Sequence, residues 1–203
     1  MGQYPGLSNQ ERIMTTKTTS KAPSNSNEKM KSNGANSSEL MELFEEQLKD
    51  ILWAEKALIK AIPKMIKLAE SDDLILALTD HLKETHEQVT RLAKIFKSID
   101  KKPRAVKCDA MEGLIEEATE MLEDCGKGPG CDAGIIAAAQ KIEHYEIATY
   151  GTLREFAETL ALSEALVLLT KTLKEEKDAD QKLTDVAKKE VNSEAASLQS
   201  QES

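Results

Sequence analysis

Residues 137–160 read AAAQKIEHYEIATYGTLREFAETL. Successive residues of an α-helix turn about 100° around its axis, so positions three, four and seven apart lie on one face. This period predicts a long helix with Ala139, Ile147 and Tyr150 on its apolar face. Glu143 and Glu146 fall within the same face. Because glutamate is almost never fully buried without a partner, something must meet these two carboxylates.

The rest of the chain repeats this helical period in segments of similar length. A shorter amphipathic helix is expected in the long connection between Ser98 and Cys131. The long helices are expected at about 38–69, 72–97, 132–159 and 163–191. The connections between them are short, long and short. Two antiparallel hairpins joined by one long crossover form the ferritin-like arrangement, so we predict an all-α, ferritin-like four-helix bundle.

The two ends of the chain lack this apolar period. Residues 1–37 are rich in Ser, Thr, Asn and Lys, and residues 192–203 are also polar. Such segments bury too little apolar surface to offset the entropy of ordering them. We therefore expect disordered tails at 1–37 and 192–203, and one bundle domain at 38–191.

Composition excludes several classes of function. A net charge of -9 argues against a nucleic-acid or anionic-membrane partner, because either would need a basic face. No apolar run approaches the ~20 residues of a membrane span. The N-terminal stretch is polar and lacks the apolar core of a secretory signal, so a soluble cytoplasmic protein is expected.

The cysteines do not predict a disulfide-bonded fold. There are three, without a CxxC pair, which indicates neither a disulfide scaffold nor a zinc site. Cys125 and Cys131 flank the loop GKGPG and could approach each other. In a reducing cytosol we expect two free thiols there.

Acids recur on the apolar faces of the other long helices. Glu55 and Glu176 lie at the centres of their stripes, Asp180 follows Glu176 by one turn, and Glu84 lies at the edge of its stripe. An ionised group costs several kcal/mol to bury. Four or five of them would cancel a domain stability of about 5–15 kcal/mol. Two divalent ions would supply four positive charges and remove this cost.

The donor types indicate which metals fit. Carboxylates are hard oxygen ligands that suit iron or manganese and can bridge two ions. In di-iron and di-manganese bundles, two helices each supply Glu-x-x-His. Here Glu87 and Ala179 occupy the corresponding His positions. His81, one turn before Glu84, is a candidate nitrogen ligand, with a hydrogen-bonded core histidine as the alternative.

These arguments predict a carboxylate-rich dinuclear iron or manganese site. Its candidate ligands are Glu55, Glu84, Glu143, Glu146, Glu176, Asp180 and His81. Tyr150, Gln88 and Arg154 are expected around the ligands. Arg154 could also neutralise one acid without any metal, and Trp53, nearly opposite Glu55 on its helix, is a candidate homodimer contact.

Several stretches resemble the YciE/YciF family of ferritin-like stress proteins over about residues 39–190. They are AEKAL at 54–58, HLKETHEQ at 81–88, KCDAMEGLIEEATE at 107–120, the stretch at 137–160 quoted above, and LKEEKDADQKLTDVA at 173–187. The resemblance implies a ferritin-like bundle, a homodimer, a rubrerythrin-like dinuclear metal site and a link to stress response. It also implies ligands at Glu55, Glu84, Glu143, Glu146, Glu176 and Asp180.

Three functions remain open from the sequence. The first is a dinuclear iron or manganese protein that reacts with peroxide or oxygen, as a catalase or peroxidase does. The second is a metal-binding module without turnover. The third is a structural helical-bundle dimer whose acids are protonated or paired with Arg154.

Overall fold

The computed structural model describes residues 33–198, and all regular structure within them is helical. The elements in chain order are α1 Asn33–Leu68, α2 Asp72–Ser98, α3 Asp109–Asp124, α4 Pro129–Thr159, α5 Ser163–Val186, the π-helical segment η1 Ala187–Val191, and α6 Asn192–Leu198. In this part of the chain, no helix is long and apolar enough to cross a membrane.

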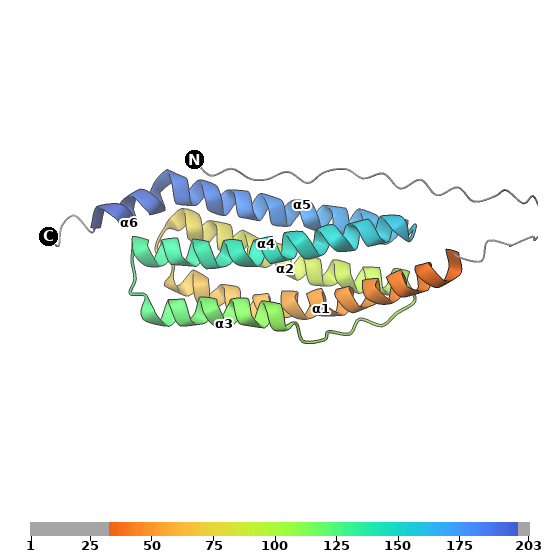
Figure 1. Cartoon of the computed structure of the whole chain (residues 1–203). Helices are drawn as coiled ribbons and strands as arrows, with labels where there is room; N and C mark the ends of the chain where they lie inside the picture. The colour runs from red at the N-terminus through yellow and green to blue at the C-terminus, as the bar shows by residue number, and fades with distance from the viewer. Residues whose placement is uncertain (1–32, 199–203) are drawn as a thin grey trace, which may run out of the picture. The chain divides into compact units, whose positions relative to one another are not determined.

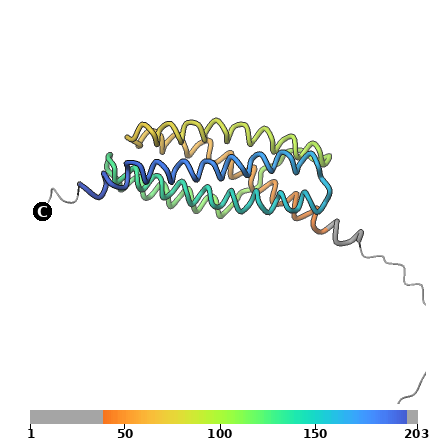
Figure 2. Tube along the Cα trace, turned by 90° about the horizontal axis from the view of Figure 1, so that it is seen from above, coloured from red at the N-terminus to blue at the C-terminus, as the bar shows by residue number. Residues whose placement is uncertain are grey.

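Four long helices form the bundle. α1 and α2 make one antiparallel hairpin, α4 and α5 make the other, and the hairpins meet through α2 against α5 and α1 against α4. Figures 1 and 2 show the four helices side by side along a common axis. α3 lies in the crossover and packs on α1 and α4, outside the four. The predicted all-α bundle of two hairpins and a long crossover is therefore confirmed.

Polar side chains fix the ends of these helices. The Ser71 hydroxyl accepts a hydrogen bond from the Leu74 amide at 3.4 Å and so caps α2. Asp132, in the first turn of α4, accepts hydrogen bonds from the amides of Glu70 at 2.9 Å and Ser71 at 2.8 Å. Its carboxylate thus ties the start of α4 to the turn between α1 and α2.

The core follows the sequence period closely. The stripe of α1, including Leu48, Ile51 and Leu58, is buried, as is that of α2 from Leu74 to Phe96. The acids predicted among these stripes are carried inward with them, because a helix cannot rotate one residue out without rotating its neighbours. The apolar packing thereby fixes where the buried acids stand.

The helical part of the chain extends past both predicted boundaries. α1 begins at Asn33, inside the segment predicted as a tail, and residues 1–32 lie outside the described residues. α5 continues through η1 into α6, which ends at Leu198 inside the second predicted tail. Val191 is buried and anchors this extension. Figure 1 shows a bend between α5 and α6, as expected at a π-helical turn.

The expectation of two free thiols at Cys125 and Cys131 is wrong. These residues form a disulfide that joins the end of α3 to the first turn of α4, with 5.4 Å between their Cα atoms. The loop between them contains Gly128 at a φ of 126°, a backbone conformation that favours glycine. The glycine-rich loop lets the two cysteines meet. Cys108 is free and buried.

Candidate metal centre

Four buried side chains converge in the middle of the bundle. They are His81 on α2, Glu143 and Glu146 on α4, and Glu176 on α5. Each offers a nitrogen or oxygen atom, and these atoms all lie within 4.8 Å of one another. Glu143 and Glu146 point the same way because they are three residues apart. We call these four residues the buried cluster.

Glu55 lies beside the buried cluster on α1. Its side chain is fully buried, and the Tyr150 hydroxyl of α4 donates a hydrogen bond to its Oε1 atom. Its charge contributes to raising the pKa values of both Glu143 and Glu146. All four long helices therefore supply at least one buried acid or histidine to this region.

Most of these groups have polar atoms without a hydrogen-bond partner. Within residues 33–198, both carboxylate oxygens of Glu146 have none. The same holds for one atom each of Glu55, His81, Glu143 and Glu176. A buried acceptor without a donor costs about 1–3 kcal/mol, and more when it is charged. The unpartnered atoms of this group could hold a metal ion, and carboxylates with one imidazole are ligands that suit iron or manganese.

Burial changes the proton affinity of the acids. It raises the pKa values of Glu143, Glu146 and Glu176 well above that of an exposed glutamate, and neighbouring carboxylates raise those of Glu146 and Glu176 further. Burial raises the pKa of Glu55 to about 8, although the Tyr150 hydrogen bond acts in the opposite direction. Without a cation, the region therefore retains protons that exposed glutamates would have lost at neutral pH.

His81 is buried in its neutral form. Burial lowers its pKa to about 4, and Lys182 lowers it further. Its Nε2 atom lies 3.2 Å from Oε1 of Glu143, while Nδ1 has no partner in the described part of the chain. A neutral imidazole with a free nitrogen is the form that ligates metals.

The structure brings two of the side chains that were expected around the ligands, Gln88 and Tyr150, close to the buried acids. Gln88 is buried and its amide donates a hydrogen bond of 2.5 Å to Oε1 of Glu176. Tyr150 holds Glu55 as described above. Arg154 is not brought to the buried cluster, since its guanidinium pairs with Glu155 and Glu158 on the outer side of α4.

The buried arginine near the site is Arg91, which sequence reasoning missed. Its guanidinium donates hydrogen bonds to Thr172 at 2.5 Å and to Glu175 at 2.9 Å. Arg91 follows Gln88 by three residues and so shares its inward face, which is the signal that could have identified it. Within residues 33–198, Arg91 forms ion pairs with Glu87 and Glu175 and with no carboxylate of the buried cluster, although its charge opposes the rise in the pKa of Glu55 that burial causes.

Glu84 and Asp180 lie outside the buried cluster. The Glu84 side chain is 30% exposed, with Oε2 4.0 Å from Nδ1 of His81, and burial raises its pKa. Asp180 is half-buried, accepts a hydrogen bond of 3.0 Å from Gln140, and lies 3.5 Å from His144. Both acids flank the four converging side chains without joining them.

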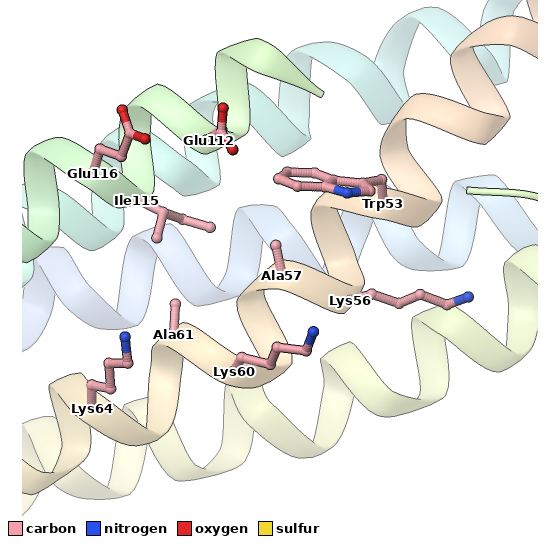
Figure 3. Close-up of a pocket in the computed structure, with 9 residues that line it drawn as sticks. All are labelled: Trp53, Lys56, Ala57, Lys60, Ala61, Lys64, Glu112, Ile115 and Glu116. Carbon is pink, nitrogen blue, oxygen red and sulfur yellow. The ribbon is translucent and has the colours of Figure 1, made fainter. Parts of the chain in front are cut away.

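A separate groove of about 490 Å³ runs between α1 and α3. Figure 3 shows Trp53 over one end of it, with Lys56, Lys60 and Lys64 along α1. Glu112 and Glu116 line it from α3. One wall is therefore basic and the other acidic, while the half-buried Trp53 contributes apolar surface.

The chain is similar to known proteins in both sequence and structure. Residues 39–196 match the family described as "Domain of unknown function (DUF892)". Protein YciF of Escherichia coli (strain K12) is 46% identical over 155 residues, which cover 76% of this chain and 93% of that protein. The crystal structure of the E. coli stress protein YciF matches with a TM-score of 0.72, covering 75% of this chain and 97% of that one.

A second solved structure is similar to the same degree. It is YcfI from Rhodopseudomonas palustris, described provisionally as a structural protein, with 45% identity and a TM-score of 0.70. The match covers 71% of this chain and 92% of that one. These findings confirm the resemblance to the YciE/YciF family.

Proposed function

Because this chain belongs to the DUF892 family of YciF-type proteins, we propose that it is a stress-associated protein with a dinuclear iron or manganese site that reacts with peroxide or oxygen. The relative YciF is named a stress protein, which supports the first part. The buried cluster supports the second.

The proposal rests mainly on the surroundings of the Glu146 carboxylate. Its side chain is fully buried, and neither of its oxygens has a hydrogen-bond partner among the described residues. A structural acid is retained by donors that satisfy it. A metal ligand in a metal-free chain is instead buried without hydrogen-bond donors, as Glu146 is. Glu146 and the other three buried glutamates, Glu55, Glu143 and Glu176, carry four negative charges together when all are ionised. Two divalent ions would balance these charges.

The residues that would hold the ions are His81, Glu55, Glu143, Glu146 and Glu176. When bound, iron or manganese supplies changes of oxidation state to a peroxide or oxygen substrate. Tyr150 orients Glu55 and Gln88 orients Glu176 through their hydrogen bonds. The raised pKa values mean that the carboxylates release protons as cations bind, so loading strengthens as pH rises.

Peroxide consumption tests this function. The full chain, purified without chelator and loaded with Mn²⁺ or Fe²⁺, should consume hydrogen peroxide. The double variant Glu146→Gln, Glu176→Gln should lose this metal-dependent consumption, because two of the ligands no longer carry charge. The control is Glu158→Gln, which makes the same chemical change on the exposed side of α4. Equal consumption by the double variant and the wild type would place the reaction elsewhere.

A second candidate function is non-catalytic. In one form the bundle binds metal without turnover, and in the other it is a structural protein without metal. The description of YcfI as a structural protein favours it. Wild-type protein that binds two ions but consumes neither peroxide nor oxygen would support the metal-holding form. Protein that binds no metal at all would support the structural form.

We also propose that two copies associate through the groove between α1 and α3. A two-fold axis would bring the lysines of one copy against Glu112 and Glu116 of the other, since a basic wall and an acidic wall complement each other across such an axis. Sedimentation should show a dimer. Lys60→Glu should weaken it, and the added substitution Glu116→Lys should restore it if the two walls meet. Monomeric wild-type protein would overturn this arrangement.

A further inference from the structure

A small cavity lies at one end of the buried cluster. It encloses about 10 Å³, close to the space that one water molecule needs, and is lined by residues of α2, α4 and α5. His81 and Glu143 line it from the buried cluster, while Glu84 and Lys182 line it from the surface side. The cavity therefore touches both the buried cluster and side chains near solvent.

Three side chains form a continuous line through this region. Oε2 of Glu84, whose side chain is 30% exposed, lies 4.0 Å from Nδ1 of His81. The other ring nitrogen of His81 lies 3.2 Å from Oε1 of Glu143. Nδ1, the nitrogen that faces Glu84, is unpartnered within residues 33–198. Oε2 of Glu84, Nδ1 of His81 and the carboxylate of Glu143 therefore offer ligating atoms in turn around this cavity.

The opposite end of the buried cluster has a different character. On α2, Gln88 lies at the same height in the bundle as Glu176 of α5, to which it donates a hydrogen bond. Arg91 follows Gln88 by three residues, which is about 4.5 Å along the helix axis. Arg91 is held by Thr172 and Glu175. The groove outside it is also lined by two lysines, Lys94 and Lys171, and by one acid, Glu87. Cations approaching from this end meet the buried, ion-paired Arg91 side chain and a groove in which Arg91, Lys94 and Lys171 outnumber the one acid, Glu87.

We propose that Glu84 and His81 form the access route by which divalent cations reach the buried cluster. Glu84 captures the cation at the surface, and the free nitrogen of His81 receives it before Glu143 does. Lys182, on the rim of the same cavity, opposes capture. This inference rests on the proposed metal site. It adds a kinetic role for Glu84, which stands outside the four converging ligands.

A route differs from a ligand in its effect on rates. Removing charge from Glu84 lowers the local concentration of cations at the mouth of the cavity and slows binding. If affinity stays the same, release must slow by the same factor, because the equilibrium constant is the ratio of the two rate constants. Removing a ligand would instead speed release.

Stopped-flow loading of the metal-free full chain with Co²⁺, followed by its absorbance, tests the route. We expect Glu84→Gln to load at least about five-fold more slowly than wild type, within the range of electrostatic steering. Extraction of bound Co²⁺ by a chelator should slow to the same extent. Stoichiometry and affinity at equilibrium should be unchanged. Lys182→Gln should load faster than wild type.

The matched control is Glu87→Gln. Glu87 lies on the same helix, has a side chain 66% exposed, and stands at the Arg91 end, 3.5 Å from that guanidinium. Its substitution removes the same formal charge, but Arg91 and Lys171 already pair with that carboxylate, so it should leave the loading rate within about two-fold of wild type.

Three outcomes would overturn the proposal in distinguishable ways. Glu84→Gln loading at the wild-type rate would overturn the route alone. Weakened equilibrium binding with faster release would make Glu84 a ligand instead. Wild-type protein that takes up no Co²⁺ would overturn the metal site and the route with it.

Discussion

Two buried carboxylates on α4 stand in opposite situations. Asp132 is 3% exposed, and each of its oxygens accepts a hydrogen bond from a backbone amide of the α1–α2 turn. Glu146, about four turns further along the same helix, is fully buried and has no partner for either oxygen among the described residues. The first acid stabilises the bundle as it stands, whereas nothing in the described part of the chain offsets the burial of the second.

Burial alone therefore does not identify a functional acid. The informative property is whether the donors that would satisfy a buried carboxylate are present. Glu55 and Glu176 fall between the two extremes, since one oxygen of each accepts a hydrogen bond and the other accepts none. If this contrast is correct, pH changes and conservative substitutions should act on the two kinds of acid with opposite signs.

The largest expected effect is the pH dependence of the metal-free protein. A group whose pKa is raised on folding stabilises the protein fully below its unfolded pKa, and this contribution is lost as pH rises through its folded pKa. The pKa of Glu55 rises from 4.5 to about 8, and those of Glu143, Glu146 and Glu176 shift in the same direction. The free energy of unfolding should therefore fall as pH rises.

His81 acts in the other direction but at lower pH. Its pKa is lowered from 6.5 to about 4, so the stability it contributes is present above pH 6.5 and lost as pH falls toward 4. Between pH 6.5 and 8 the carboxylates dominate, and the four interacting acids together should account for about 2 kcal/mol or more. Urea unfolding without metal should show this decline. A flat or rising curve would contradict it.

The satisfied acid should respond strongly to a neutral substitution. Asp132→Asn keeps the size of the side chain but turns one oxygen into a donor that faces a backbone amide. We expect a loss of about 3 kcal/mol in the free energy of unfolding, since hydrogen bonds to charged groups contribute about 1.5–3 kcal/mol each. Denaturant titration measures it. A loss below about 1 kcal/mol would show that this acid is not needed where it stands.

The same chemical change at the unsatisfied acid should have the opposite sign. Glu146→Gln removes a group that resists ionisation in its buried position. Without metal, we expect a gain of about 2 kcal/mol at pH 8 and a smaller one at pH 5, because burial raises the pKa of the wild-type Glu146. The exposed control Glu158→Gln should stay within about 0.5 kcal/mol of wild type. Destabilisation by Glu146→Gln at pH 8 would make Glu146 a structural acid.

The smallest effect concerns the intermediate case, Glu55. Tyr150→Phe removes the one hydrogen bond that this carboxylate accepts from a side chain. We expect a loss of about 1 kcal/mol in the metal-free protein. The loss should shrink in a Glu55→Gln background, and a double-mutant cycle measures that coupling. Additive effects would mean that the hydroxyl contributes through packing instead.

Sequence periodicity predicted the positions that lie at the centre of apolar stripes. Glu55, Glu143, Glu146 and Glu176 are all buried, because their helices cannot bury the neighbouring leucines and isoleucines without them. Periodicity was weaker at stripe edges. Glu84 and Asp180 share a helix face with buried residues. Their distance from the buried cluster depends on the separation between neighbouring helices, and the sequence period of a single helix does not determine that separation.

Other features depend on contacts between segments. Arg154 shares a helix face with buried residues yet pairs with Glu155 and Glu158 at the surface, while Arg91 turns inward to Glu175 of another helix. Long side chains can reach either way, so spacing does not determine their partners. The disulfide between Cys125 and Cys131 depends on the path of a glycine-rich loop, and α6 depends on continuation of α5 through η1.

Calorimetric titration of the metal-free full chain with Mn²⁺ at neutral pH tests the central claim most directly. The unpartnered carboxylates predict two ions per chain for wild type, with release of protons, and none at the same concentrations for Glu146→Gln, Glu176→Gln. The Glu158→Gln control should bind as wild type does. Wild-type protein that binds no Mn²⁺ or Fe²⁺, or a double variant that still binds two ions, would contradict the assignment of the buried cluster as a metal centre.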